Sequence, residues 1–234
     1  MLQIRKSSDR GQADFGWLRS QHSFSFGSYH DPLHNRFGPL LVINEDRVAP
    51  GQGFGTHGHR DMEIISYVLE GELAHKDSMG NGSVLRAGDV QRMSAGAGVR
   101  HSEFNHSPSA GVHFLQIWIM PNVQGGAPGY AERHVTPQAK RGRLCLIASG
   151  DGRADSLSIL QDADVYASIV EPADTLTHVL RPGRAAYVHL VRGTARVNGA
   201  TLAGGDAAKL WDEASVTIDQ AEGAELLLFD LPQH

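Results

Sequence analysis

The sequence is poor in cysteine and in long apolar runs, and each shortage excludes a class of protein. Its 234 residues include one cysteine, Cys145, so no internal disulfide can form and a reducing compartment is expected. Cys145 lies in an apolar run, which favours an unreactive core thiol. No stretch of 18 apolar residues is present, and the first residues lack the apolar segment of a signal peptide. We therefore expect no membrane association and predict a cytoplasmic protein.

Positive charge is also scarce. The chain has 21 Lys and Arg against 26 Asp and Glu, a formal net charge of −5, and no run of five basic residues. Binding to nucleic-acid phosphates needs a concentrated basic surface. The sequence therefore predicts no direct contact with nucleic acid, whereas a protein partner remains possible.

Short apolar runs separated by glycine-marked turns dominate the chain. These runs have the length of strands and are rich in branched and aromatic residues, while long helical periodicity is absent. The pattern predicts an all-β protein built as a sandwich or barrel. The clearest runs are Leu40–Ile43, Glu63–Leu69, Val112–Ile119, Ala186–Val191 and Glu225–Phe229.

A weak internal repeat divides the chain into two halves. Tyr67-Val-Leu-Glu-Gly71 is followed by Ala87-Gly-Asp89, and His189-Leu-Val-Arg-Gly193 is followed by Gly204-Gly-Asp206. A repeat of more than 100 residues indicates two copies of one β domain.

The join between the copies is expected in the proline- and glycine-rich segment 122–140. We therefore divide the chain into domains at 1–130 and 131–234. Aligned on the two repeat glycines, His57 and His59 of the first half correspond to Val179 and Arg181 of the second. If the first half binds a metal, the second has lost the site.

Two short dyads, His57-x-His59 and His101-x-Glu103, carry the chemistry of the first half. Residues i and i+2 of a strand point to the same face, so two dyads on facing strands can converge on one point. Three imidazoles and a carboxylate suit a divalent transition metal and leave positions open for water, oxygen or substrate.

The identity of the carboxylate ligand stays open at this level. Asp61 and Glu63 have the same parity as His57 and His59, so parity alone does not choose between them and Glu103.

The remaining polar and aromatic candidates are placed by their position along the predicted strands. His75 and His106 are expected in turns or at the pocket rim. His113 and Gln116 have opposite parities on one strand, so at most one faces the pocket. An apolar pocket wall is expected from Phe24, Phe26, Met93 and Trp118.

The motifs resemble those of a known family. Gly53-Phe-Gly-Thr-His-Gly-His-Arg-Asp-Met-Glu63, Tyr67–Gly71, Gly88–Gly96 and His101-Ser-Glu103 are similar to the pirin family of cupins. Further segments resemble its bacterial quercetin dioxygenase-like branch: His22–Phe26, Gln116–Ile119 and Leu228–Pro232.

The resemblance implies a bicupin, two tandem jelly-roll β-barrels with one metal in the first. It implies the ligands His57, His59, His101 and Glu103, and a metal that is commonly Fe(II), although Mn, Ni, Co, Cu or Zn also suit such a site. Glu63 then becomes a pocket group.

The resemblance also implies an activity: opening the ring of a flavonol such as quercetin with dioxygen. The small aromatic substrate would bind at the metal, with Glu103 as the candidate base and Glu63 as the second. The alternative is a non-enzymatic, metal- or redox-sensing protein that binds a regulatory protein partner, as the family's transcription-linked relatives do.

Overall fold

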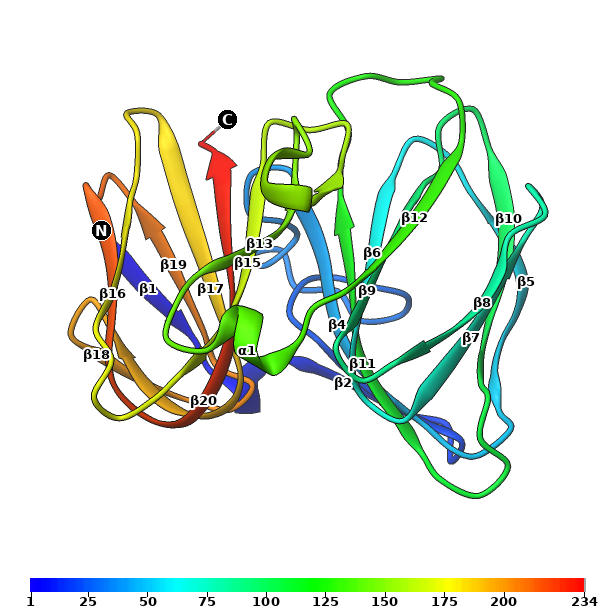
Figure 1. Ribbon diagram of the computed structural model, residues 1–234, viewed down its shortest axis with the longest axis horizontal. Coiled ribbons are helices and arrows are strands. Elements are labelled where there is room, and N and C mark those ends of the chain that lie inside the picture. The colour runs from blue at the N-terminus through cyan, green and yellow to red at the C-terminus, as the bar shows by residue number, and fades with distance from the viewer. Residues whose placement is uncertain (234) are drawn as a thin grey trace.

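The computed structural model describes residues 1–233 and consists almost entirely of strands, which confirms the all-β prediction. Two β-barrels lie side by side, the N-terminal one on the right of Figure 1 and the C-terminal one on the left. The helical elements are the single turn α1 (Pro137–Lys140) and two 3₁₀ turns, Ser7–Asp9 and Arg153–Asp155. No helix within residues 1–233 is long and apolar enough to cross a membrane.

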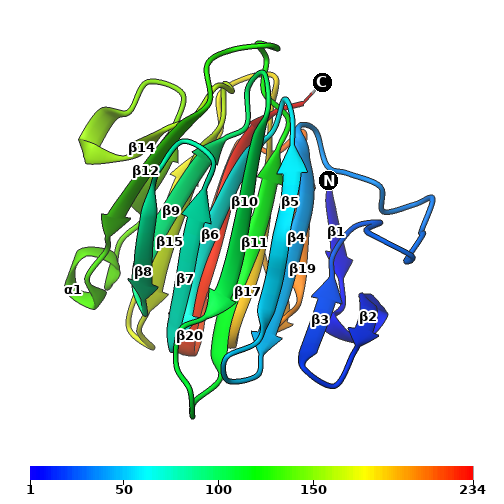
Figure 2. The same ribbon diagram turned by 90° about the vertical axis from the view of Figure 1, so that its right-hand side faces the viewer.

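Two sheets form the N-terminal barrel. The outer sheet, which faces the viewer in Figure 2, has the order β5 (Gly53–His59), β10 (Val99–Asn105), β7 (Glu72–Asp77) and β8 (Gly82–Arg86). The inner sheet has the order β12 (Gly129–His134), β9 (Asp89–Ser94), β6 (Glu63–Glu70), β11 (Val112–Ile119), β4 (Leu40–Val48), β3 (Leu18–His22) and β2 (Gly11–Asp14).

One large sheet curls into the C-terminal barrel. Its order is β1 (Leu2–Arg5), β19 (Ala207–Trp211), β17 (Arg184–Val197), β20 (Ser215–Pro232), β15 (Asp164–Val170), β13 (Cys145–Ser149) and β14 (Leu157–Ser158). Two further strands pair at its sides, β16 (Leu176–Val179) with β20 and β18 (Ala200–Ala203) with β17. All five predicted apolar runs lie within strands, namely β4, β6, β11, β17 and β20.

The segment 122–140 is more ordered than its composition predicted. Strand β12 runs through it and pairs with β9, so the expected linker contains a strand of the first barrel. The division at residue 130 falls inside that strand. The chain also crosses between halves at its start, because β1 pairs with β19 of the C-terminal sheet. Composition marked this segment as loop, but Tyr130–Arg133 has side chains that suit an edge strand.

A shared apolar core joins the two halves. Ile65 and Ile117 of the first inner sheet belong to one buried cluster with Tyr187, Leu227 and Phe229 of the second half. Cys145 is partly buried at the edge of this cluster. A second cluster fills the C-terminal barrel. The two barrels are therefore packed through a continuous core rather than connected as loose domains.

The repeat predicted from sequence is visible in the backbone. Gly71 and Gly193 have nearly equal positive φ angles, 77° and 76°. A Cβ at Gly71 would lie 2.5 Å from the carbonyl oxygen of Gly111, and one at Gly193 would lie 2.3 Å from that of Gly223. Only glycine permits both this φ and this close approach, so each copy keeps it at the same strand crossing.

Candidate metal centre

The pairing of β5 with β10 brings the two dyads together. His101 lies directly opposite His57 in the register, with a bulge between His101 and Glu103. The ring centroids of His57, His59 and His101 are 4.5 to 4.9 Å apart, and each offers a nitrogen within 4.8 Å of the others. The two dyads thus converge as alternation along each strand predicted, and the three imidazoles could hold one metal ion.

The protonation of these histidines suits metal binding. Burial, with His57 nearby, lowers the pKa of His59 to about 4, and burial with the neighbouring histidines lowers that of His101 to about 3. Both rings are therefore neutral at pH 7, the state that binds metals. The Nδ1 of His57 lies 2.8 Å from the carbonyl oxygen of Gly55, so it carries the proton and leaves Nε2 free as a ligand atom.

His101 supplies a direct test of whether the site fits a metal. Its side chain is 1% exposed, and neither ring nitrogen has a hydrogen-bond partner among the described residues. A buried polar atom without a partner is costly. A cation between the three imidazoles would satisfy a His101 nitrogen, so the donor set fits the metal that the sequence predicted.

Glu103 lies beside the histidines and is held by its own partners. Ser66 Oγ donates to Oε1 at 3.1 Å and Gln116 Nε2 donates to Oε2 at 2.8 Å. Complete burial, with Asp46 nearby, raises the pKa of Glu103 to about 7. A carboxylate oxygen of Glu103 lies within 4.8 Å of ring nitrogens of His75 and His101, forming a second group that shares His101 with the first.

His75 is not the turn or rim residue that we expected. It is buried on β7, opposite Glu103 in the register. Its ring stacks on Tyr130 with the centroids 4.9 Å apart, and its Nε2 lies 3.4 Å from Asp77 Oδ2. Leu73, His75 and Asp77 alternate inward along β7, and this alternation was the signal that could have found it.

The other two carboxylate candidates do not join the cluster. Glu63 lies on β6 and is buried, with Ser94 Oγ donating to it at 2.8 Å. Ile64 and Ser66 point into the barrel, so Glu63 points to the opposite face. Asp61 sits in the turn between β5 and β6 with φ 48° and accepts a hydrogen bond from the Gly125 N–H. Parity does not carry across this turn, so neither residue joins the histidine cluster and neither lines the cavity beside it.

The remaining polar predictions agree with the structure. His106 is exposed just after β10. Of the opposite-parity pair, Gln116 faces the pocket and contacts Glu103, whereas His113 Nε2 lies 3.0 Å from Glu45 Oε1 outside it.

His57, His59 and Glu103 line a cavity of about 500 Å³. Phe26 and Trp118 line it as predicted, whereas Phe24 and Met93 do not and pack in apolar clusters instead. Aromatic residues that the sequence did not single out complete the wall: Phe15, Trp17 and Phe54. Asp46, also missed, contributes a buried carboxyl group to the same wall.

A polar layer crosses the N-terminal barrel and is absent at the equivalent level of the second. Ser66 pairs with Gln116 across β6 and β11, and both contact Glu103. At the same register of the second copy, Val188 pairs with Leu228, and both lie in its apolar core. The groups that could hold a metal within residues 1–233 all belong to the first barrel.

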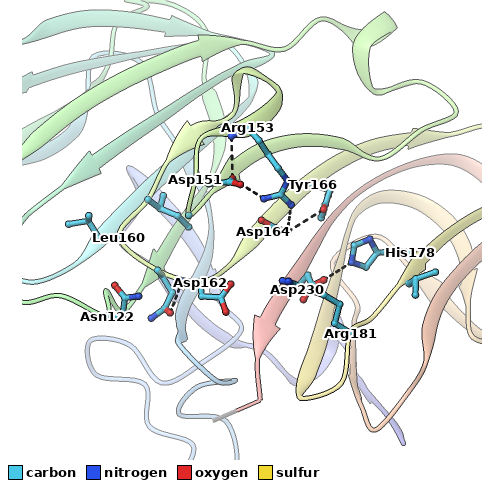
Figure 3. Close-up of a pocket in the computed structure, with 14 residues that line it drawn as sticks. Asn122, Asp151, Arg153, Leu160, Asp162, Asp164, Tyr166, His178, Arg181 and Asp230 are labelled. Atoms are coloured by element: carbon cyan, nitrogen blue, oxygen red, sulfur yellow. Dashed lines mark hydrogen bonds and ion pairs between the residues drawn. The ribbon is translucent and has the colours of Figure 1, made fainter.

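The second half has a cavity of its own, about 760 Å³, shown in Figure 3. Its charged side chains are mostly paired with one another. His178 Nε2 lies 2.7 Å from Asp230 Oδ2, Arg184 Nε donates to Asp230 Oδ1 at 2.5 Å, and Arg153 Nη2 donates to Asp164 Oδ2 at 2.5 Å. Guanidinium groups already neutralise these carboxylates, so this cavity does not resemble the metal centre.

Two tandem cupin barrels define a bicupin, and among residues 1–233 the groups that could hold a metal lie in the first barrel. Comparison with known proteins gives the particular family. A family model described as "Pirin" matches residues 3–119, and one described as "Quercetinase C-terminal cupin domain" matches residues 146–231. The chain belongs to the pirin family.

Individual relatives cover the chain almost completely. It is 43% identical over 232 residues to a protein of Escherichia coli K12 named quercetin 2,3-dioxygenase, covering 99% of both chains. It is also 43% identical to a pirin-like protein of Caulobacter vibrioides, covering 97% of this chain and 98% of that one. The solved bacterial pirin YhhW from Escherichia coli, in complex with nickel(II), matches with a TM-score of 0.96 and 41% identity over all of both chains.

Proposed function

We propose that this protein is a metal-dependent dioxygenase that uses molecular oxygen to open the ring of a flavonol such as quercetin. The observation that carries the proposal is the convergence of His57, His59 and His101 at an aromatic-walled cavity of about 500 Å³. That volume suits a small aromatic ligand. The quercetin 2,3-dioxygenase name of a relative 43% identical over 99% of the chain supports the same reaction.

We assign the metal ligands as His57, His59, His101 and Glu103, with Fe(II) as the proposed ion. Mn, Ni, Co, Cu and Zn also suit this donor set, and the nickel(II) complex of the solved relative supports nickel among them. When bound, the metal would supply a Lewis acid and an electronic link between substrate and oxygen.

The protein's own side chains orient the substrate and handle its proton. Trp118 and Phe26 pack edge to face at 5.4 Å and offer apolar surface to a flat ring system. Glu103, with its pKa raised to about 7, is suited to accept the proton of a substrate hydroxyl at a carboxylate oxygen near neutral pH. Ser66 and Gln116 hold that carboxylate in place. Glu63 points to the other face of β6 and does not line the cavity, so we assign it no role as a base.

The test is oxygen uptake and ring opening of quercetin by protein loaded separately with Fe, Mn, Ni, Co, Cu and Zn. We expect turnover above the free-metal rate with at least one ion. His101→Ala should lose bound metal and activity together, while His106→Ala, a matched change at an exposed histidine, should retain both. Absence of turnover with every ion would reject the substrate assignment, and full metal retention by His101→Ala would reject the ligand assignment.

The cytoplasmic location also remains a prediction. Cell fractionation would check it, and recovery of the protein in a membrane or secreted fraction would contradict it.

A further inference from the structure

Asp46 is a buried carboxyl group in the wall of the cavity beside the histidines, and the proposed reaction assigns it no role. It lies on β4, is 3% exposed, and lines the same cavity as His57 and Glu103. Ser20 sits opposite it in the register of β3. Its Oδ1 receives no hydrogen bond from any residue between 1 and 233.

The other polar groups on this wall are committed to one another. Asn44 Oδ1 and His22 Nδ1 lie 2.9 Å apart, and Gln116 donates to Glu103. Asp46 thus lines the cavity with one carboxyl oxygen, Oδ1, that has no hydrogen-bond partner among residues 1–233, while Ser20 interacts with the same carboxyl group. Trp118 supplies a complementary donor, since its buried Nε1 also lacks a partner in the described chain.

Keeping such a carboxyl group in an apolar wall is costly. Burial raises the pKa of Asp46 to about 7. A buried polar atom with no hydrogen-bond partner has lost its water without gaining a replacement, which lowers the stability of the folded protein. A carboxyl group with a perturbed pKa in the wall of a cavity is a candidate for contact with a ligand.

We propose that Asp46 is a specificity-determining residue whose Oδ1 accepts a hydrogen bond from a ligand hydroxyl other than the one beside the three imidazoles. The inference rests on the proposed function, because it takes the ligand to be a hydroxylated aromatic. The pocket then selects polyhydroxylated rings: aromatic walls bind the ring faces, and Asp46 distinguishes ligands that carry the extra hydroxyl from those that lack it.

The experiment compares two ligands with the same ring skeleton. Quercetin carries hydroxyls on all three rings, whereas 3-hydroxyflavone keeps only the hydroxyl next to the carbonyl. Binding of each to nickel-loaded protein is followed by tryptophan fluorescence quenching without oxygen, so that no turnover intervenes. The variants are Asp46→Ala and the near-isosteric Asp46→Asn, with Asp9→Ala, a matched change at an exposed carboxyl group outside the cavity, as the control.

We expect Asp46→Ala to weaken quercetin binding roughly 10- to 100-fold, the range for a hydrogen bond to a charged group. Asp46→Asn should lose about 3- to 10-fold, because an uncharged acceptor remains. Binding of 3-hydroxyflavone should change less than about 3-fold in either variant, and Asp9→Ala should change the binding of neither ligand. Nickel content and thermal midpoint establish that each variant is folded and loaded.

The results separate the two proposals. Equal losses for both ligands, or no loss for quercetin, would overturn the role of Asp46 while leaving the dioxygenase proposal intact if wild-type protein still turns quercetin over. Failure of the wild-type protein to bind either flavonol would overturn both.

Discussion

Gln116→Leu removes one hydrogen bond from Glu103 and leaves the three histidines in place. The Gln116 side chain is buried, and its Nε2 donates to Glu103 Oε2 at 2.8 Å. Leucine has similar volume and is the residue found at the equivalent register of the second barrel, Leu228, so a packing defect is not expected. The substitution therefore isolates the contribution of this donor to metal binding.

The magnitude follows from the charge on the acceptor. A hydrogen bond to an ionised group contributes about 1.5–3 kcal/mol, and 1.4 kcal/mol is tenfold in a binding constant. Because Glu103 binds metal only when ionised, the loss of the Gln116 donor should weaken metal binding roughly 10- to 100-fold. The pKa of Glu103, already raised by burial to about 7, should rise further.

The assay is nickel(II) titration against a competing chelator at pH 7, with Gln12→Leu on an exposed position of β2 as the matched control. We expect the control to bind as wild type does. Repeating the titration at pH 8 should recover part of the affinity of Gln116→Leu, since the carboxyl group is then more ionised. An unchanged affinity at both pH values would refute the reasoning, because it would mean that Glu103 does not contribute to metal binding.

Three further predictions concern stability. His189 is fully buried, and burial lowers its pKa from 6.5 to about 3. Between pH 6.5 and pH 3 the unfolded chain therefore binds a proton that the folded protein does not, so the free energy of unfolding falls as the pH falls. His189→Leu should reduce the change in the free energy of unfolding by up to about 1.4 kcal/mol per pH unit. Urea denaturation at pH 7, 6 and 5 measures this change, and the same pH dependence in the variant and the wild type would contradict the prediction. Glu225→Leu should lower the free energy of unfolding by about 3–5 kcal/mol, because Lys140 is left buried without its carboxylate. The double variant with Lys140→Met should recover much of the lost stability. A double variant as unstable as Glu225→Leu alone would contradict the pairing. Gly71→Ala should destabilise by more than Gly199→Ala, which shares the positive φ but has open space around its Cβ; equal thermal midpoints would show that the close approach to Gly111 is unimportant.

The sequence predicted those parts of the site that lie within single strands. His57 and His59 share β5, and His101 and Glu103 share β10, so alternation sufficed to place each pair on one face. The pairing of β5 with β10 was a hypothesis at that level. These strands are not consecutive along the chain, and alternation within one strand does not specify which distant strand pairs with it.

The errors arose where the argument crossed a turn or depended on which face is the interior. Counting from His59 left Asp61 and Glu63 open as carboxylate candidates, but the chain reverses at Asp61 with φ 48° and the count restarts. Asp46 lies on β4, which begins with an apolar run that is buried on both faces. Buried and less buried residues alternate only from Asn44 to Val48, a stretch too short for the sequence to single out Asp46. His75 needed the pairing of β7 with β10 to be recognised as a neighbour of Glu103.

The difference between the two barrels reduces to one layer of side chains. Holding a buried carboxylate requires donors, and Ser66 and Gln116 supply them at the level of Glu103. Val188 and Leu228 fill the equivalent level of the second barrel with apolar volume, which gives its core continuity but leaves nothing to hold such a carboxylate. Placing histidines at Val179 and Arg181 would therefore not be enough to create a metal centre there. The loss of the site in the second copy is a property of this supporting layer as much as of the ligands themselves.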